Sequence, residues 1–315
     1  MINRILELRP RLVSDCPIAA LAADAAVMPG IISKLMPAFL SALHAQSNLD
    51  TRLAGRSPNS GVNYFSTHPP TGDRVRKTSG EAQAFPDSDL KRRDTYLRKI
   101  SGITYGDSAK QGFARGQTFY HPQIGFSFTA PNGYRIVNQP SQVVVTANNG
   151  AALLYDMAKR TQGQSAENYL VGSWLKNKAG VRAERTSVNG MNAATAAFNG
   201  TVNGKAMTIR VMAIEFAPET FARFQIAIPN GASKAVVDDL KRASYSFKRL
   251  SNREKNNLKP FRLRTVKAKS GDTIASVASK MPYDDKREER FRVLNGLLPN
   301  ETLVAGRAYK IVSKN

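Results

Sequence analysis

Two apolar segments joined by Asn203-Gly204 place the strongest constraint on how this chain can fold. Ala193 to Phe198 precedes the dipeptide, and Met207 to Phe216 follows it. Asn and Gly adopt positive φ angles more readily than other residues, so Asn-Gly between apolar segments is typical of a two-residue β-hairpin turn. The sequence therefore predicts a pair of antiparallel strands on either side of this dipeptide.

The segments around the hairpin repeat the same pattern over 119–248. Short or alternating apolar runs between turn residues predict further strands, and three- and four-residue spacing predicts helices. The predicted strands lie within 124–128, 134–136, 142–147, 152–158 and 221–228, and the predicted helices within 166–178 and 232–247. Hairpins with helices between them predict an antiparallel α+β sandwich that folds by itself. In outline the pattern is similar to PsbP/DcrB-like domains.

Residues 1–100 are predicted to be mainly helical. Apolar residues recur at helical spacing from Ile31 to Leu43, with Pro37 bending the helix. Asp87-Ser88 can cap a second helix that runs to Ile100. The glycine-rich segment 102–116 predicts a domain boundary.

A turn within this N-terminal part contains a histidine between a hydroxyl pair and two prolines, in Ser66-Thr67-His68-Pro69-Pro70. Pro69 restricts His68 to extended geometry, and from the residues alone His68 is either a turn residue or a ligand. The wider segment Phe-Ser-Thr-His-Pro-Pro-x-x-Asp-Arg-Val resembles the Ser-Thr-His-Pro segment of HtpX/BepA-type zinc metallopeptidases. That resemblance covers about residues 15–82 and implies that His68 would lie close to a zinc ion.

The same resemblance implies that the catalytic part of the family is not in this chain. The family's Glu ligand falls on Ala20, whereas its following Asp is kept as Asp24. No His-Glu-x-x-His occurs in the sequence, and zinc hydrolases need such a His pair and a Glu to activate water. We therefore expect a helical metallopeptidase remnant over 1–100, truncated or degenerate, with no cofactor and no proteolysis by itself. His68 could bind metal only if a zinc site were completed elsewhere, for example by a separately encoded peptidase front.

The C-terminal residues 263–315 contain a second motif. Ser270-Gly271-Asp272-Thr273 precedes an apolar helical run, and Val293-Leu294-Asn295-Gly296 precedes the final apolar strand. Asp272 or Thr273 can cap a helix, and Gly296 suits a helix end. The order resembles a LysM module of βααβ fold, which implies binding of N-acetylglucosamine polymers such as peptidoglycan. Gly271, Asp272, Thr273 and Asn295 are the candidate binding positions, with a mainly structural role, and the charged insertion 281–290 is longer than in typical LysM modules.

Charge is the strongest signal in the composition. The net charge is +22 and the isoelectric point is near 10.3, so the chain is expected to be attracted to polyanions. Nine Lys and Arg residues lie between Lys248 and Lys269, where 249–262 is either a solvated basic linker or a polyanion contact. Aromatic residues do not interleave with them, which argues against a base-stacking nucleic-acid surface.

Two hypotheses follow for the function. The first is a remnant of an envelope zinc metallopeptidase, and the second is a non-catalytic envelope protein that binds peptidoglycan or another polyanion. The resemblances imply the cell envelope or periplasm, although residues 1–15 show no signal peptide and the chain as written would be cytoplasmic. The single Cys16 leaves no intramolecular disulfide, and no apolar run approaches the roughly 20 residues of a membrane span.

Overall fold

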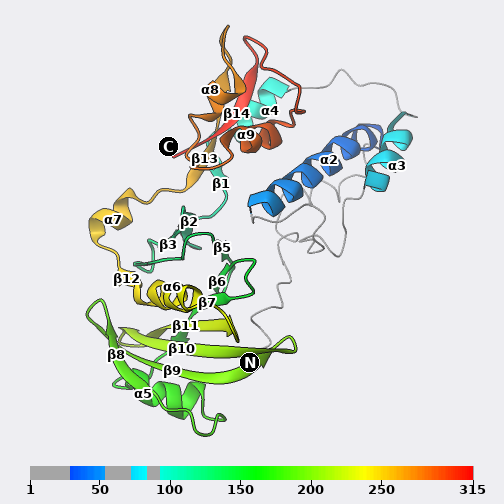
Figure 1. Ribbon diagram of the computed structural model, residues 1–315. Helices are drawn as coiled ribbons and strands as arrows, with labels where there is room; N and C mark the ends of the chain where they lie inside the picture. The colour runs from blue at the N-terminus through cyan, green and yellow to red at the C-terminus, as the bar shows by residue number, and fades with distance from the viewer. Residues whose placement is uncertain (1–28, 54–71, 84–92, 315) are drawn as a thin grey trace. The chain divides into compact units, whose positions relative to one another are not determined.

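The computed structural model describes residues 29–53, 72–83 and 93–314, and these fall into two compact units. Unit 1 comprises residues 104–261, and unit 2 comprises the described parts of 8–103 together with 262–314 (Figure 1). Both helices and antiparallel strands are present, which confirms the predicted α+β class. None of the described helices is long and apolar enough to cross a membrane.

Unit 1 is built on a seven-stranded antiparallel sheet with the order β5-β6-β7-β11-β10-β9-β8. Its strands are β5 (Arg135–Asn138), β6 (Val143–Thr146), β7 (Ala152–Lys159), β8 (Glu184–Val188), β9 (Met191–Val202), β10 (Lys205–Ala217) and β11 (Thr220–Pro229). The long strands β9, β10 and β11 are joined by short turns. Every predicted strand from 134 onward is therefore present. Strand β8 was not predicted, because its sequence is mostly polar.

The Asn203-Gly204 turn forms as predicted and sets the register of β9 against β10. Lys205 pairs with Val202, and the ladder continues to the pair Ile214 and Ala193. Asn203 and Gly204 have φ angles of 49° and 75°. Both central residues lie in the left-handed region, as a hairpin turn that follows the twist of the strands requires.

A smaller four-stranded sheet and a helix cover one face of the large sheet. The small sheet has the order β12-β4-β3-β2, from β2 (Phe113–Arg115), β3 (Thr118–His121), β4 (Phe126–Thr129) and β12 (Lys248–Arg249). Helix α6 (Lys234–Tyr245) begins at Ser233, whose side chain accepts a hydrogen bond from Val236 N. The core between these layers is rich in aromatic rings, including Phe126, Tyr155, Phe224 and Phe247. Strand β2 lies in the glycine-rich segment that the sequence indicated as a connector, as does the short β1 (Thr104–Tyr105).

The opposite face of the large sheet is covered by α5 (Ala166–Tyr169) and the π-helical turn η3 (Leu170–Trp174). The sequence predicted one longer helix over 166–178. The α-helical part ends after one turn, and Gly172 and Ser173, which follow, are weaker helix formers than their neighbours. Tyr169 and Leu170 are buried against Phe221 and Ile209 of the sheet.

Residues 249–262 are more ordered than their composition suggested. Lys248 and Arg249 pair with β4, and α7 (Asn252–Asn257) follows. Ser251 and Glu254 form a reciprocal capping box: Ser251 Oγ accepts from Glu254 N at 3.2 Å, and Glu254 Oε2 accepts from Ser251 N at 2.8 Å. The capping box thus stabilises a short helix in a segment where the sequence analysis identified only a run of basic residues.

This capping box predicts a local response to acid. Hydrogen bonds from Lys248 and then from Ser251 lower the pKa of Glu254 from 4.5 to about 2. The stabilisation is complete above pH 4.5 and is lost as the pH falls through about 2, because a depressed carboxyl pKa favours the folded state only while the group is ionised. We expect the protection factors of the α7 amides, measured by NMR and corrected for the intrinsic exchange rate at each pH, to fall over that interval. Glu254→Gln is expected to remove the pH dependence, and an unchanged acid response in that variant would contradict the assignment.

The C-terminal part of unit 2 is a strand–helix–helix–strand module. It consists of β13 (Phe261–Lys267), α8 (Ile274–Ala278), α9 (Arg287–Asn295) and β14 (Ala308–Ser313), and β13 pairs with β14 antiparallel. Its core contains Ile274, Val277, Phe291 and Tyr309. The predicted order of elements is therefore present, whereas the LysM family assignment stays a prediction.

Helix α4 (Arg93–Ile100) packs on this module, although the sequence placed it with the N-terminal helices. Arg93 Nη2 donates to Ala308 O at 2.6 Å, and Gly102 N donates to Leu263 O at 2.7 Å. Leu97 is buried, as are Leu263 and Val312 of the strands. The module therefore includes a segment that lies more than 150 positions away in the sequence.

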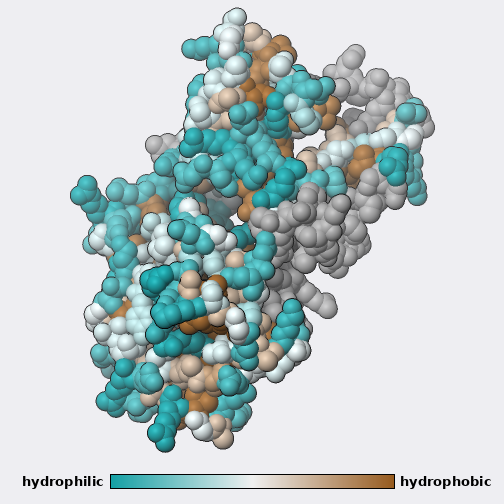
Figure 2. All heavy atoms as spheres, viewed as in Figure 1, coloured by the Kyte–Doolittle hydropathy of each residue, from teal (hydrophilic) through white to brown (hydrophobic). Residues whose placement is uncertain are grey.

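Among the described residues of unit 2, the other two helices are α2 (Pro29–Leu53) and α3 (Gly72–Gln83), which contact each other. The predicted helix 31–43 is thus the first part of α2, and Pro37 lies within it. Asp24, His68, Ala20 and Cys16 lie outside the described residues. Figure 2 shows the face of the molecule in view as largely hydrophilic, with hydrophobic atoms in small, separate patches.

Candidate functional site

The turn before α8 holds three of the four predicted binding residues. Gly271 has a φ of 82°, which L side chains rarely adopt, and Asp272 Oδ2 accepts from Lys269 N at 2.8 Å. Thr273 and Ser276 exchange hydrogen bonds between side chain and backbone, at 3.0 Å and 3.1 Å. These contacts fix the turn and the start of α8, so all three residues have a structural role here.

Asn295, the fourth predicted residue, joins α9 to β14. Its Nδ2 donates to Lys310 O at 2.9 Å and its Oδ1 accepts from Lys310 N at 2.7 Å. Nδ2 also lies 3.0 Å from Phe291 O. The side-chain amide of Asn295 therefore makes the pair of hydrogen bonds to the β14 backbone that a neighbouring strand would make. Gly296, at a φ of 64°, ends α9 directly after Asn295.

Hydrogen bonds of three side chains, those of Arg292, Glu301 and Tyr309, hold the loop between α9 and β14, residues 297–307. Arg292 Nη1 donates to Leu298 O at 2.6 Å and to Glu301 O at 3.0 Å. Glu301 Oε2 accepts from Leu298 N at 2.6 Å, and Val304 N donates to Tyr309 Oη at 3.0 Å. The loop nevertheless keeps two aliphatic side chains in solvent, since Leu298 is 62% and Val304 55% exposed. A fixed loop with exposed aliphatic groups is suited to contact an apolar ligand face at low entropic cost.

The charged insertion 281–290 is paired mainly within itself. Arg290 Nη2 lies 2.9 Å from Asp285 Oδ1, and its guanidinium stands 4.3 Å from the centre of the Tyr283 ring. Lys286 reaches Glu289 at 3.6 Å. These charges therefore serve the turn that leads into α9.

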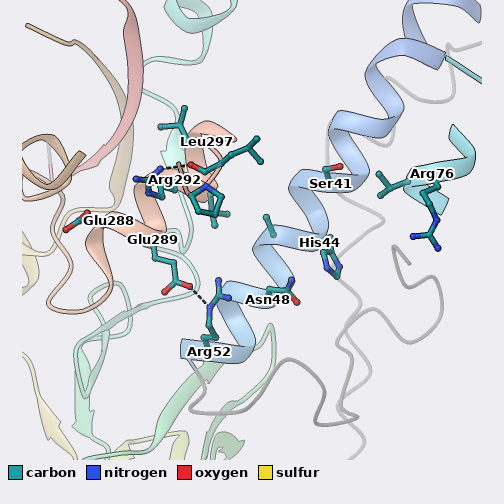
Figure 3. Close-up of a pocket in the computed structure, with 14 residues that line it drawn as sticks. Ser41, His44, Asn48, Arg52, Arg76, Glu288, Glu289, Arg292 and Leu297 are labelled. Carbon is teal, nitrogen blue, oxygen red and sulfur yellow. Dashed lines mark hydrogen bonds and ion pairs between the residues drawn. The ribbon is translucent and has the colours of Figure 1, made fainter. Parts of the chain in front are cut away.

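A pocket of about 860 Å³ lies beside α9 within unit 2 (Figure 3). One wall is formed by α9 and the start of the rigid loop, and the other by α2, with α3 at the rim. Arg52 of α2 and Glu289 of α9 form an ion pair across it. The lining residues are Ser41, His44, Ala45, Asn48, Arg52, Val75, Arg76, Glu288, Glu289, Arg292, Val293, Leu297, Leu298 and Pro299.

The pocket combines hydrogen-bonding and aliphatic groups. Asn48, Glu288 and Ser41 offer polar atoms, whereas Leu297 and Pro299 offer apolar surface. Figure 3 shows Arg52 and Glu289 pointing toward each other and His44 projecting from α2 away from α9. Such a mixture can bind a polar ligand with apolar faces, as a sugar has.

The described residues contain no group of three or more His, Cys, Asp or Glu that could hold a metal ion. Of the predicted metallopeptidase positions, Asp24 and His68 lie outside the described residues. His121 is the last residue of β3, and its Nδ1 accepts a hydrogen bond from Ile124 N at 3.2 Å. Burial lowers its pKa, so its neutral form is favoured.

The basic stretch 248–269 is divided between structural contacts and solvent. Lys248 pairs with Glu254, Arg249 donates to Phe216 O, and Arg262 donates to Gly102 O at 2.6 Å. Lys267, near its C-terminal end, lines a cleft together with Arg93 and Arg307. Sequence reasoning missed both arginines because each is isolated in its own segment and carries no motif.

No family model and no curated protein matches this chain. Among solved structures, it is similar to a protein of Bacteroides thetaiotaomicron with 13% identity and a TM-score of 0.35, covering 48% of this chain and 53% of that chain. The chain thus spans about half the length of that protein. LpqN of Mycobacterium tuberculosis, described as involved in cell envelope biogenesis, has 14% identity and a TM-score of 0.32, covering 53% of this chain and 99% of LpqN. The PsbP of Synechocystis (CyanoP) has 12% identity and a TM-score of 0.31, covering 52% of this chain and 97% of CyanoP. At these TM-scores the similarities carry neither a fold assignment nor a function to the chain.

Proposed function

We propose that this chain is a non-catalytic binding protein of the bacterial cell envelope whose C-terminal module binds a glycan such as peptidoglycan. In this proposal unit 1 is a PsbP/DcrB-like scaffold, and the N-terminal helices are the remnant of a metallopeptidase. The module is LysM-like, and its ligand contacts come from the loop 297–307 and the adjoining pocket.

The rigid loop is the observation that carries the proposal. Arg292, Glu301 and Tyr309 fix its backbone while Leu298 and Val304 stay exposed. Aliphatic side chains that remain in water on a preformed loop have no role in the core of the module, and they match the apolar face of an N-acetylated sugar. The polar lining of the pocket supplies donors and acceptors for its hydroxyl and amide groups.

Proteolysis by this chain is not part of the proposal. The sequence has Ala20 at the family's Glu position and contains no His-Glu-x-x-His. Without a metal-bound water and a carboxylate to activate it, a zinc hydrolase has no nucleophile. A complete metallopeptidase site would need ligands beyond those in this sequence.

Polyanion binding is the second candidate, and the net charge of +22 favours it. Attraction between exposed charges is screened over about 10 Å at 0.1 M salt and about 3 Å at 1 M salt. Glycan contacts made by hydrogen bonds and apolar surface are much less sensitive to salt. Salt dependence therefore separates the two candidates.

The test is co-sedimentation of the full chain with purified peptidoglycan at low and high salt. We expect a salt-resistant fraction of binding that falls about tenfold in Leu298→Ser, because burying a leucine side chain contributes about 1.5–3 kcal/mol. Leu298 is exposed, so the substitution is expected to leave the fold intact.

Leu35→Ser is the matched control, since Leu35 is 58% exposed in the same unit but does not line the pocket. It is expected to bind like the unmodified chain. Binding that vanishes entirely at high salt would leave only the charge effect and would overturn glycan recognition.

A further inference from the structure

A second cleft, of about 350 Å³, lies on the module at the start of β14. Lys267 pairs with Ala308 across the β13–β14 ladder, and Thr265 pairs with Lys310. Alternate residues of a strand share a face, so these four residues lie on the same face as the pair Leu263 and Val312. Both members of that pair are buried outside the cluster formed by α8 and α9. Lys267 and Ala308 therefore lie on the face opposite the helical core, whereas Tyr309, whose ring Arg93 and Arg307 approach, belongs to that core.

Three cationic side chains line this cleft. The lining residues are Arg93, Asp94, Lys267, Gly306, Arg307 and Ala308. The guanidinium carbons of Arg93 and Arg307 lie 5.9 Å and 5.8 Å from the centre of the same Tyr309 ring, which places both groups around one side chain. Within the described part of the chain, neither Lys267 nor Arg307 makes a hydrogen bond or ion pair through its side chain.

The surroundings add positive charge to the cleft. Burial, followed by the charge of Arg93, lowers the pKa of Lys310, which is a further cationic residue close to Arg93. Arg93 Nη2 donates a hydrogen bond to Ala308 O at 2.6 Å. This bond holds the guanidinium of Arg93 next to the start of β14. Asp94 is the single acidic residue of the lining. Like charges held together on a rigid sheet are unfavourable unless an anion lies between them.

We propose that this cationic cleft, defined by Arg93, Lys267 and Arg307, binds a phosphate group of a phosphodiester-containing envelope polymer. Guanidinium groups bind phosphate oxygens through paired hydrogen bonds, and an ammonium group adds a point charge. A phosphodiester offers two charged oxygens that can be shared among three such donors. The assignment of the phosphate to an envelope polymer rests on the proposed function, whereas phosphate binding by the cleft does not.

The test measures the dissociation constants of the full chain for inorganic phosphate and for poly(glycerol phosphate) by calorimetry at fixed salt. We expect the double variant Lys267→Gln with Arg307→Gln to weaken both by about tenfold or more, because charge-assisted hydrogen bonds are lost. Both side chains are exposed, so an unchanged thermal transition is expected to show that the fold is retained.

The matched control is Lys269→Gln with Lys280→Gln, which removes the same charge from exposed positions of the same module outside the cleft. It is expected to weaken binding by less than about twofold. If both double variants weaken phosphate binding equally, binding depends only on the overall positive charge of the module, and the proposal of a specific phosphate site is contradicted.

Two further measurements are needed. The first identifies the source of the phosphate, and the second tests phosphate binding separately from glycan binding. Single-stranded DNA with the same number of phosphates is expected to bind more weakly than poly(glycerol phosphate), and equal, cleft-dependent binding of DNA would overturn the assignment to an envelope polymer. Leu298→Ser is expected to leave phosphate binding unchanged. If the unmodified chain binds phosphate through the cleft but shows no salt-resistant binding to peptidoglycan, the proposed function alone is contradicted.

Discussion

Asp156→Ala is expected to lower the free energy of unfolding of unit 1 by about 3 kcal/mol, because it leaves a guanidinium unpaired between the sheet and its covering helix. Asp156 on β7 and Arg223 on β11 are register partners. Arg223 Nε donates to Asp156 Oδ1 at 2.7 Å, and Nη2 donates to Oδ2, so the pair is bidentate. Their side chains are only 18% and 17% exposed.

The same guanidinium also anchors the helix that covers the sheet. Arg223 Nη1 donates to Tyr169 Oη at 2.9 Å, and the Trp174 ring centre lies 4.6 Å from the guanidinium carbon. Burial opposes the charged form of Arg223, but the hydrogen bond and charge of Asp156 outweigh it and raise its pKa. Loss of Asp156 therefore loosens α5 and η3 as well as the strand pair.

The measurement is urea unfolding followed by fluorescence of Trp174, the single tryptophan of the chain. Asp238→Ala breaks the exposed pair of Lys234 and Asp238 and is expected to leave the midpoint unchanged. Asp156→Leu combined with Arg223→Met is expected to recover most of the loss, since apolar replacement of both partners removes the unpaired charge. A double variant no more stable than Asp156→Ala would contradict the argument.

Phe247→Ala is expected to have an effect at least as large, a loss of about 3–5 kcal/mol from unit 1. Phe247 is fully buried directly after α6. Its ring centre lies 5.4 Å from that of Phe126, 5.5 Å from that of Phe216 and 5.9 Å from that of Phe224. Truncation to alanine leaves a cavity where the small sheet, the large sheet and α6 meet, which urea unfolding followed by circular dichroism would measure.

Tyr155→Phe is the matched control, because it changes the same aromatic cluster without making a cavity. The Tyr155 ring centre lies 5.8 Å from that of Phe247, and its buried hydroxyl has no hydrogen-bond partner among the described residues. Burial accordingly raises the pKa of Tyr155 far above its usual value. Removing an unpaired buried hydroxyl is expected to stabilise the domain by about 1 kcal/mol, and a comparable loss in both variants would contradict this view of the cluster.

Most of unit 1 could be predicted from the sequence because its signals are local. The Asn203-Gly204 turn requires two residues with positive φ, and strands of period two on either side follow directly. The order strand–helix–helix–strand of the C-terminal module was equally readable, since Gly271 and Thr273 mark a turn and a helix start. The helix α7 could have been found from Ser251 and Glu254, whose spacing is that of a capping box.

The sites were decided by contacts between distant segments. Arg93 and Ala308 are 215 positions apart, and no periodicity or turn signal in either segment indicates that they meet. The bidentate pair of Asp156 and Arg223 likewise depends on which strands become neighbours and in which register. Local sequence determines φ and ψ preferences and which face of an element is apolar, and these fixed the elements of this chain. Which charged side chains become neighbours depends on how the elements pack to bury apolar surface across the whole unit. The cationic cleft is an example, because only the tertiary structure brings Arg93 next to Lys267 and Arg307.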